Sequence, residues 1–484
     1  MKICFATSEC VPFVKTGGLA DVSGALPAAL VAAGNEVKVF LPLYEAIRVL
    51  DHDLIFAHEF HNTPVRVGGK TVTINVWYKR AESGVEYYFI DCPQYYHRPQ
   101  VYTNDADEGE RFILLQDAAF LIMQRFNWAP DVIHCNDWQT ALMPVFLREK
   151  YQWDRLFQRT ASVLSIHNVG YQGRFSKDLL ASAGLSPAKY HLGGAYEFYD
   201  SFSFLKSGLM YADMITTVSP TYAQEIQTAE FGAGMETVLR GRAPDLAGIL
   251  NGIDTQEWSP RTDRFTAHHY DENDLAAKLK NKQALLAHAH LPFDENVPVF
   301  GMITRLTEQK GLELVASAFD VIMQWPIQFL ILGSGAQKYE DFLRWAAQSY
   351  PGKVAVYTGF NNELAHWITA GCDMFIMPSR YEPCGLNQMY CLNYGTVPIV
   401  RRTGGLADTV QDYYEFHGEG NGFSFYDFTA HALWTSMQRA LNLFPQTEVW
   451  QKIMRRGMRA DFSWNHSARQ YLEVYQRAQS KRGI

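Results

Sequence analysis

Arg305 and Lys310 place two cations in one short stretch, RLTEQKG (305–311). The stretch follows VPVFGMIT (297–304), an apolar run predicted to be a strand, so both side chains belong to a strand-to-helix loop. Two cations there can neutralise the charge that develops on a departing diphosphate, which lets a transferase work without covalent chemistry. Loop lysines and arginines are more often only solvated. Lys15, in the first strand-to-helix loop of the chain, favours the functional interpretation.

Glu382 lies in the stretch EPCGLNQMY, after an apolar strand predicted to end at Pro378. A helix predicted to begin near Cys384 would direct the backbone amides of Cys384, Gly385 and Leu386 toward the same region, where they suit a phosphate. The Glu382 carboxylate can accept hydrogen bonds from sugar hydroxyls. It can equally cap the helix, because acidic side chains favour helix N-termini.

Polar groups follow two further buried strands. Asp137 ends the stretch DVIHCND, and His167 lies in SVLSIHN, which predicts that both side chains reach the edge of a cleft. Asp137 can instead cap the following helix, and a lone histidine beside a strand is more often structural than catalytic. Tyr95 and Tyr96 begin the aromatic run YYHRPQVY, whose rings suit a carbohydrate acceptor, although most aromatic side chains belong to the core.

The hexapeptide TGGLAD occurs twice, at 16–21 and at 403–408. Glycine pairs let the backbone approach a ligand closely, and the first turn of the following helix attracts anions. We therefore expect one ligand to be held between the two turns. The candidate binding residues in these turns are Gly17, Gly18, Thr403 and Gly404. The alternative is that both glycine pairs only make tight helix starts.

The elements that position these residues form two series. A strand, a loop, a helix and a second strand open the chain, and the same order restarts at residue 297. Parallel strands bridged by helices predict doubly wound sheets, in which ligands bind beyond the carboxyl ends of the strands. The segment 251–265 is rich in Pro, Asp and Asn and is predicted to be a linker. The sequence thus predicts two α/β domains.

Composition excludes several classes of protein. The net charge of −8 over 484 residues argues against a nucleic-acid partner, and no apolar run is long enough to cross a membrane. Seven scattered cysteines without a CxxC pair predict reduced thiols and a cytoplasmic location. No metal-ligand spacing is found, so we expect no bound metal. The motifs GxSxG, GxxxxGK[ST] and GxGxxG are also missing, which disfavours serine-hydrolase, P-loop and dinucleotide-binding functions.

The motifs KTGGLADV, HNVGYQG, VSPTYAQEI, RLTEQKG, EPCGLNQMY and RRTGGLADTV, taken in order, resemble bacterial glycogen synthases and the related plant starch synthases. The resemblance implies the GT-B fold, with two Rossmann-like domains (1–250 and 251–459) that face a deep interdomain cleft. It also implies a final segment, 460–484, that crosses back onto the N-terminal domain. The implied activity is transfer of glucose from ADP-glucose to the non-reducing end of an α-1,4-glucan such as glycogen, without a cofactor.

The resemblance also implies roles for single residues. On this basis Lys15 touches the sugar nucleotide, Arg305 and Lys310 hold its diphosphate, and Glu382 binds the glucose hydroxyls. The amides of Cys384, Gly385 and Leu386 meet glucose or phosphate, while Asp137, His167 and Asn251 line the sugar and acceptor side. Many retaining GT-B enzymes carry a second glutamate eight positions after the first, where it meets the ribose. Here that position is Tyr390, so the ribose contact is unassigned.

The resemblance further implies that the configuration at the transferred sugar is retained. Because the sequence offers no convincing nucleophile for the far face of the sugar, front-face transfer is favoured, in which an oxygen of the leaving diphosphate helps to deprotonate the acceptor. Two alternatives are a glucan phosphorylase with lysine-bound pyridoxal phosphate and an inert glucan-binding protein. The sequence leaves open the oligomeric state and the strength of the preference for ADP-glucose over UDP-glucose.

Overall fold

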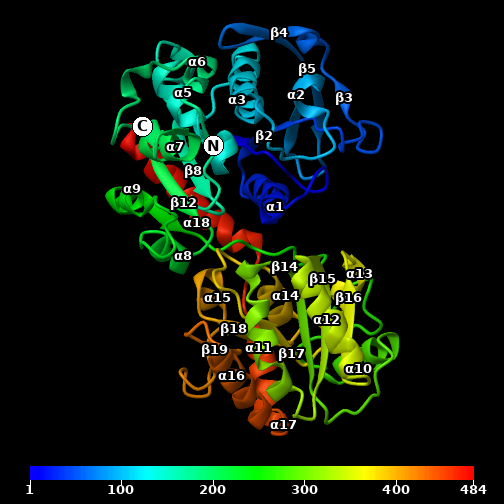
Figure 1. The fold of residues 1–484 in the computed structure, drawn as a ribbon. Coiled ribbons are helices and arrows are strands. Elements are labelled where there is room, and N and C mark those ends of the chain that lie inside the picture. The colour runs from blue at the N-terminus through cyan, green and yellow to red at the C-terminus, as the bar shows by residue number, and fades with distance from the viewer. Residues whose placement is uncertain (484) are drawn as a thin grey trace. The chain divides into compact units, whose positions relative to one another are not determined.

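A computed structural model describes residues 1–483 of the chain, which divide into two compact units (Figure 1). Unit 1 contains residues 1–218, 223–252 and 464 onward, and unit 2 contains residues 219–222 and 253–463. The main boundaries therefore lie at 252/253 and 463/464, where the sequence predicted 250/251 and 459/460. The C-terminal helix α18 (Trp464–Lys481) folds with unit 1.

Unit 1 is built on a ten-stranded mixed sheet. Its strands in spatial order are β13 (Leu246–Gly248), β12 (Met214–Thr217), β8 (Ala161–Ile166), β7 (Val132–Asn136), β1 (Lys2–Ala6), β2 (Glu36–Pro42), β6 (Glu86–Asp91), β5 (Lys70–Arg80) and β3 (Ile55–Phe56), with β4 (Thr63–Val67) paired to β5. From β13 to β6 all pairs are parallel, and the other pairs are antiparallel. A small antiparallel sheet contains β10 (Glu197–Phe198), β11 (Ser201–Ser203) and β9 (Arg174–Phe175).

The helices of unit 1 connect and cover these strands (Figure 1). They are α1 (Gly18–Ala32), α2 (Pro93–Tyr96), α3 (Glu108–Arg125), α4 (Asp137–Thr140), α5 (Met143–Glu149), α6 (Leu179–Ala183), α7 (Phe204–Tyr211), α9 (Glu236–Gly241) and α18, while α8 (Pro220–Glu225) contains residues of both units. Helix α18 packs against α1 and β8. Under it, the Tyr475 hydroxyl bonds His134 Nδ1 at 2.7 Å, and His134 Nε2 bonds Ser165 Oγ at 2.6 Å.

Unit 2 is built on a six-stranded sheet in which every pair is parallel. In spatial order its strands are β16 (Val354–Thr358), β15 (Gln328–Gly335), β14 (Val299–Leu306), β17 (Met374–Met377), β18 (Val397–Arg401) and β19 (Phe423–Phe425). Its helices are α10 (Ala276–His288), α11 (Leu312–Ile322), α12 (Gln337–Ser349), α13 (Asn362–Gly371), α14 (Asn387–Asn393), α15 (Gly404–Thr409), α16 (Ala430–Leu443) and α17 (Thr447–Met458). Counted from β14, the strand order is 3-2-1-4-5-6, the order of a Rossmann fold.

The core of unit 2 has two layers because successive strand residues point to opposite faces of the sheet. In β15, Phe329 and Ile331 join the cluster under α11, α12, α16 and α17. Their neighbours Leu330 and Leu332 join the cluster under α10 and α13. Strands covered on both faces have to be apolar throughout, which explains the uninterrupted apolar runs in the sequence.

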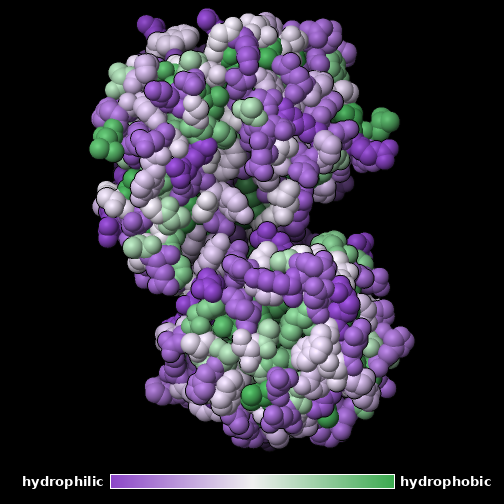
Figure 2. All heavy atoms as spheres, in the orientation of Figure 1, coloured by the Kyte–Doolittle hydropathy of each residue, from purple (hydrophilic) through white to green (hydrophobic). Residues whose placement is uncertain are grey.

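Hydrophobic residues on the face drawn in Figure 2 occur as separate patches among hydrophilic ones. The most exposed large hydrophobic side chains of the described residues include Leu50, Leu192 and Phe360. Within residues 1–483, no helix is both long enough and apolar enough to cross a membrane.

Candidate functional site

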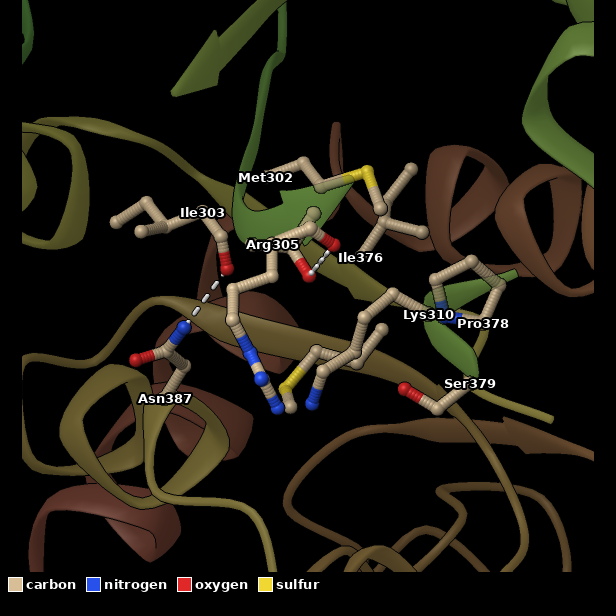
Figure 3. Close-up of a pocket in the computed structure, with 10 residues that line it drawn as sticks. Met302, Ile303, Arg305, Lys310, Ile376, Pro378, Ser379 and Asn387 are labelled. Atoms are coloured by element: carbon tan, nitrogen blue, oxygen red, sulfur yellow. Dashed lines mark hydrogen bonds between the residues drawn. The ribbon is translucent and has the colours of Figure 1, made fainter. Parts of the chain in front are cut away.

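The first candidate site lies in unit 2 at the point where the strand order reverses, between β14 and β17. In open parallel sheets this switch point is where ligands bind. A cavity of about 150 Å³ occupies it and is drawn in Figure 3. Its lining comes from the two strands, from the segments that follow them and from the start of α14, and comprises Met302, Ile303, Thr304, Arg305, Lys310, Ile376, Met377, Pro378, Ser379 and Asn387.

Glu382 is buried beside this cavity and is paired with a cation. Its Oε2 lies 2.6 Å from Lys310 Nζ and accepts a hydrogen bond from Ser379 Oγ at 2.9 Å. The Glu382 side chain is only 8% exposed and that of Lys310 17%, so water screens the pair weakly. The sequence left open whether Glu382 caps a helix; in the structure its carboxylate fixes the Lys310 ammonium instead.

Arg305 provides a second cation in the same cavity. Arg305 is the last residue but one of β14 and is exposed, and Figure 3 shows its side chain and that of Lys310 reaching into the same part of the cavity. Opposite, the Asn387 amide donates to the Ile303 carbonyl at 2.8 Å, which ties the start of α14 to β14. The cavity thus offers two positive groups of unit 2 to an anion.

The loop between Glu382 and α14 departs from expectation. Helix α14 begins at Asn387, three residues later than predicted, so Cys384, Gly385 and Leu386 belong to a loop and not to a helix turn. The reason is Gly385, whose φ of +72° is left-handed and interrupts the helical path. Cys384 is buried, whereas Gly385 and Leu386 are half-buried.

The second TGGLAD turn packs against this loop. A Cβ atom on Gly404 would lie 1.9 Å from the Glu382 carbonyl oxygen, and one on Gly405 would lie 2.1 Å from the Cys384 carbonyl oxygen. Thr403 and Gly404 are both buried. The glycine pair therefore allows the backbone of this turn to approach the backbone of the Glu382 loop closely. The binding roles of Thr403 and Gly404 stay predictions.

The second candidate site lies in unit 1, at the switch point between β1 and β7. Asp137 follows β7 with a φ of +55°, which is a left-handed conformation that costs energy outside glycine and often occurs at functional sites. Its carboxylate accepts the His167 backbone N–H at 2.7 Å. Burial raises the pKa of Asp137 to about 7, although hydrogen bonds from the backbone amides of His167 and Asn168 act to lower it.

His167 follows β8, next to Asp137. Burial lowers the pKa of His167 to about 3, so its imidazole is neutral at pH 7. His167 Nε2 lies 2.9 Å from Asn136 Oδ1, and because an amide oxygen only accepts, Nε2 carries the proton. Nδ1 is consequently the basic nitrogen. The structure thus brings together Asp137 and His167, a protonatable carboxyl group and a neutral imidazole.

The loop with Lys15 is open. The Lys15 side chain is 51% exposed and pairs with Asp21 at 2.7 Å. A Cβ on Gly18 would meet no atom within 4 Å, and Gly17 is half-buried. Asn251, at the end of the unit 1 strands, is buried, and its Oδ1 has no hydrogen-bond partner among the described residues. A buried acceptor without a partner fits a ligand or water contact.

The tyrosines proposed for the acceptor glucan are buried. The Tyr95 hydroxyl donates to Glu110 Oε2 at 2.9 Å, and the Tyr96 hydroxyl donates to the Arg111 carbonyl at 2.7 Å. Their acceptor role stays a prediction. Within residues 1–483, no group of three or more His, Cys, Asp or Glu side chains could hold a metal ion, and the seven cysteines are free and buried.

Sequence reasoning missed two residues of the unit 2 cavity. Ser379 donates a hydrogen bond to the Glu382 carboxylate, and Asn387 donates one to the Ile303 carbonyl of β14. Serine and asparagine are so frequent in loops that neither residue type carries a signal alone. The signal that could have found them is position, because Ser379 lies two residues after the end of β17 and Asn387 begins α14.

Comparison with known proteins identifies the family. Residues 2–241 match the starch synthase catalytic domain, and residues 286–456 match the glycosyl transferases of group 1. A glycogen synthase of Desulforudis audaxviator is 47% identical over 99% of this chain and 97% of its own, and one of Koribacter versatilis is 44% identical over 100% and 99%. The chain belongs to the glycogen synthase family.

A solved relative supports the same assignment. The catalytic domain of starch synthase IV from Arabidopsis thaliana, bound to ADP and acarbose, has a TM-score of 0.90, 34% identity and 99% coverage of both chains. A sucrose-phosphate synthase of Thermosynechococcus elongatus, with a TM-score of 0.59 and 18% identity over 98% of both chains, shares the fold. The expected fold class, GT-B with two Rossmann-like parallel-sheet domains, is confirmed.

Proposed function

We propose that the chain transfers glucose from ADP-glucose to the non-reducing end of an α-1,4-glucan such as glycogen, releasing ADP with retention of configuration. The observation that carries this proposal is the Lys310–Glu382 pair beside Arg305 at the β14/β17 switch point. Membership of the glycogen synthase family supports the substrates.

In this proposal, Arg305 and Lys310 bind the diphosphate and stabilise the charge that grows on it as the glycosidic bond breaks. The carboxylate of Glu382 holds Lys310 through Oε2, which leaves Oε1 to accept a hydroxyl of the glucose. Fixed donors cost little reorganisation during the reaction, so they favour the transition state over the bound donor.

The unit 1 edge would act on the sugar and the acceptor. Lys15 adds a cation for the sugar nucleotide, and Asp137, His167 and Asn251 supply acceptors for hydroxyl groups. The neutral Nδ1 of His167 can accept a hydroxyl hydrogen bond at pH 7. We infer front-face transfer, in which an oxygen of the departing diphosphate takes the proton of the acceptor hydroxyl and Asp137 orients the sugar.

We propose ADP-glucose as the preferred donor over UDP-glucose. The starch synthase IV neighbour was solved with ADP, and it resembles this chain over its full length. Measuring nucleotide release from each donor, with and without glycogen, tests this choice. Faster release of UDP than of ADP would reject it, and release that does not require glycogen would reject the glucan acceptor.

Lys310→Ala tests the mechanism. Removing one of two groups that stabilise the leaving diphosphate should lower turnover with ADP-glucose and glycogen by about 100-fold or more. Arg344→Ala is a matched control, since Arg344 is an exposed cation of unit 2 paired with Asp341 and should leave turnover unchanged. Turnover of Lys310→Ala within a few-fold of wild type contradicts the assigned role.

A further inference from the structure

A buried carboxylate supports the Lys15 loop. Glu9 follows β1, and its side chain is almost fully buried. It accepts hydrogen bonds from the backbone N–H and the hydroxyl of Thr16, from the backbone N–H of Gly17 at 3.1 Å, and from the Tyr102 hydroxyl at 3.1 Å. No Lys or Arg of the described residues forms an ion pair with Glu9, so neutral donors alone satisfy this buried carboxyl group.

Few atoms pack against residues 15–18, the end of the loop and the start of α1. A Cβ atom on Gly18 would meet nothing within 4 Å, and one on Gly17 would meet only Glu9 Oε1, at 4.0 Å. Thr16 is exposed, and the Lys15 side chain is half exposed. A loop with so few packing contacts takes its geometry from its hydrogen bonds, and Glu9 accepts three of them.

We propose that Glu9 is a positioning residue for the Lys15 loop: its carboxylate holds residues 16 and 17 so that the Lys15 ammonium is directed at the anionic donor. Glu9 acts through Lys15 and the loop backbone and does not touch the sugar nucleotide. This inference rests on the proposed function, which assigns Lys15 to the donor.

Glu9 also has an electrostatic effect that does not depend on the Lys15 loop. Its charge contributes, after burial, to the raised pKa of Asp137. The titratable groups that face Asp137 are Glu9, His167 and Tyr102, and His167 is neutral at pH 7. Neutralising Glu9 should therefore lower the pKa of Asp137 and move the pH dependence of the rate to lower pH.

The variants are Glu9→Gln, which keeps an acceptor oxygen and the side-chain volume, and Glu9→Ala, which removes both. The control is Glu197→Gln, at another buried carboxylate of unit 1, which accepts the Asp200 backbone N–H at 2.9 Å. We expect Glu9→Ala to raise KM for ADP-glucose about tenfold. Glu9→Gln should raise KM about two- to threefold and shift the pH profile of the rate to lower pH. Glu197→Gln should leave KM unchanged. Unchanged KM in Glu9→Ala overturns the proposal, and an unshifted profile in Glu9→Gln overturns the electrostatic effect of Glu9 on Asp137.

A double variant tests whether Glu9 acts through Lys15. If it does, Glu9→Ala combined with Lys15→Ala should have the same KM as Lys15→Ala within twofold, because coupled residues are not additive. If KM of the double variant instead rises by the product of the two single-variant factors, the proposal is overturned.

Hydrogen exchange gives a readout that does not require activity. The amides of residues 16 and 17 should lose protection in Glu9→Ala and keep it in Glu197→Gln, at equal urea midpoints of unfolding. Unchanged protection, or a lowered midpoint that accounts for the loss, overturns the proposal. A wild-type chain that releases no nucleotide from ADP-glucose rejects the proposed function instead, and the exchange result then still decides how the loop is held.

Discussion

The two TGGLAD copies have one sequence and two structures. At 16–21, Gly17 precedes helix α1 and Gly18 begins it, in open space: Gly18 has no atom within 4 Å of where a Cβ would be. At 403–408 both glycines are buried, with carbonyl oxygens about 2 Å from where their Cβ atoms would be. The first copy is held by a side chain, Glu9, and the second by direct contact of its backbone with the loop of Glu382. An identical motif therefore does not imply an identical physical role.

Alanine substitution in each copy is the sharpest test of this difference, and it has the largest expected effect. Gly404→Ala should lower the free energy of unfolding by about 3 kcal/mol, because its Cβ would overlap the Glu382 carbonyl oxygen and its φ of +45° strains an alanine. Gly18→Ala should change it by less than about 0.5 kcal/mol. Urea unfolding measures both. Equal losses in the two variants would show that the copies are equivalent after all.

Replacing Asp137 of unit 1 and Glu382 of unit 2 by their neutral amides should change the free energy of unfolding in opposite directions. The raised pKa of Asp137 means that the folded chain binds more protons than the unfolded chain between pH 3.8 and about 7, so stability falls as pH rises through that range. Asp137→Asn should raise the free energy of unfolding by about 2 kcal/mol at pH 8 and change it little at pH 4. Glu382→Gln should lower it at pH 8, because Lys310 loses its partner.

Unfolding of both variants by urea, followed across pH, checks these signs. Equal destabilisation of Asp137→Asn at pH 4 and pH 8 would contradict the prediction that the ionised Asp137 carboxylate lowers the free energy of unfolding.

The smallest expected effect concerns single hydroxyls. Ser379 and Thr16 each donate one hydroxyl hydrogen bond to a buried carboxylate, Glu382 and Glu9 respectively. Ser379→Ala should lower the free energy of unfolding by about 1–2 kcal/mol, because Ser379 is itself buried. Thr16→Val should cost less than about 1 kcal/mol, since Thr16 is exposed and Glu9 keeps its other donors. A larger loss in Thr16→Val than in Ser379→Ala would reverse the comparison.

The fold was predictable because most of the parallel strands have a largely apolar run that is followed by a polar loop. The same regularity placed Arg305, Lys310 and Glu382 at one edge, where the structure joins Lys310 to Glu382. The start of α14 was not predictable from its pattern, because the left-handed φ of Gly385 depends on how the loop packs.

The partners of the carboxylates could not be predicted either. Nothing in the residue types shows that Ser379 bonds Glu382 or that Glu9 bonds Thr16, because such contacts depend on where strands of one sheet end in space. The two TGGLAD copies make the same point. Their glycines were predictable as tight turns, but burial of the second copy follows from its neighbours in the fold.

The contact between His134 and Tyr475, 341 positions apart, has a consequence for biosynthesis. While a ribosome is still making unit 2, the sheet of unit 1 lacks the helix that covers β8 and supplies the hydroxyl bound to His134. Most of unit 1 thus leaves the ribosome before unit 2 but is completed after it. Nascent chains halted just before residue 464 should expose its apolar sheet face to chaperones, and release of the final helix should end that exposure.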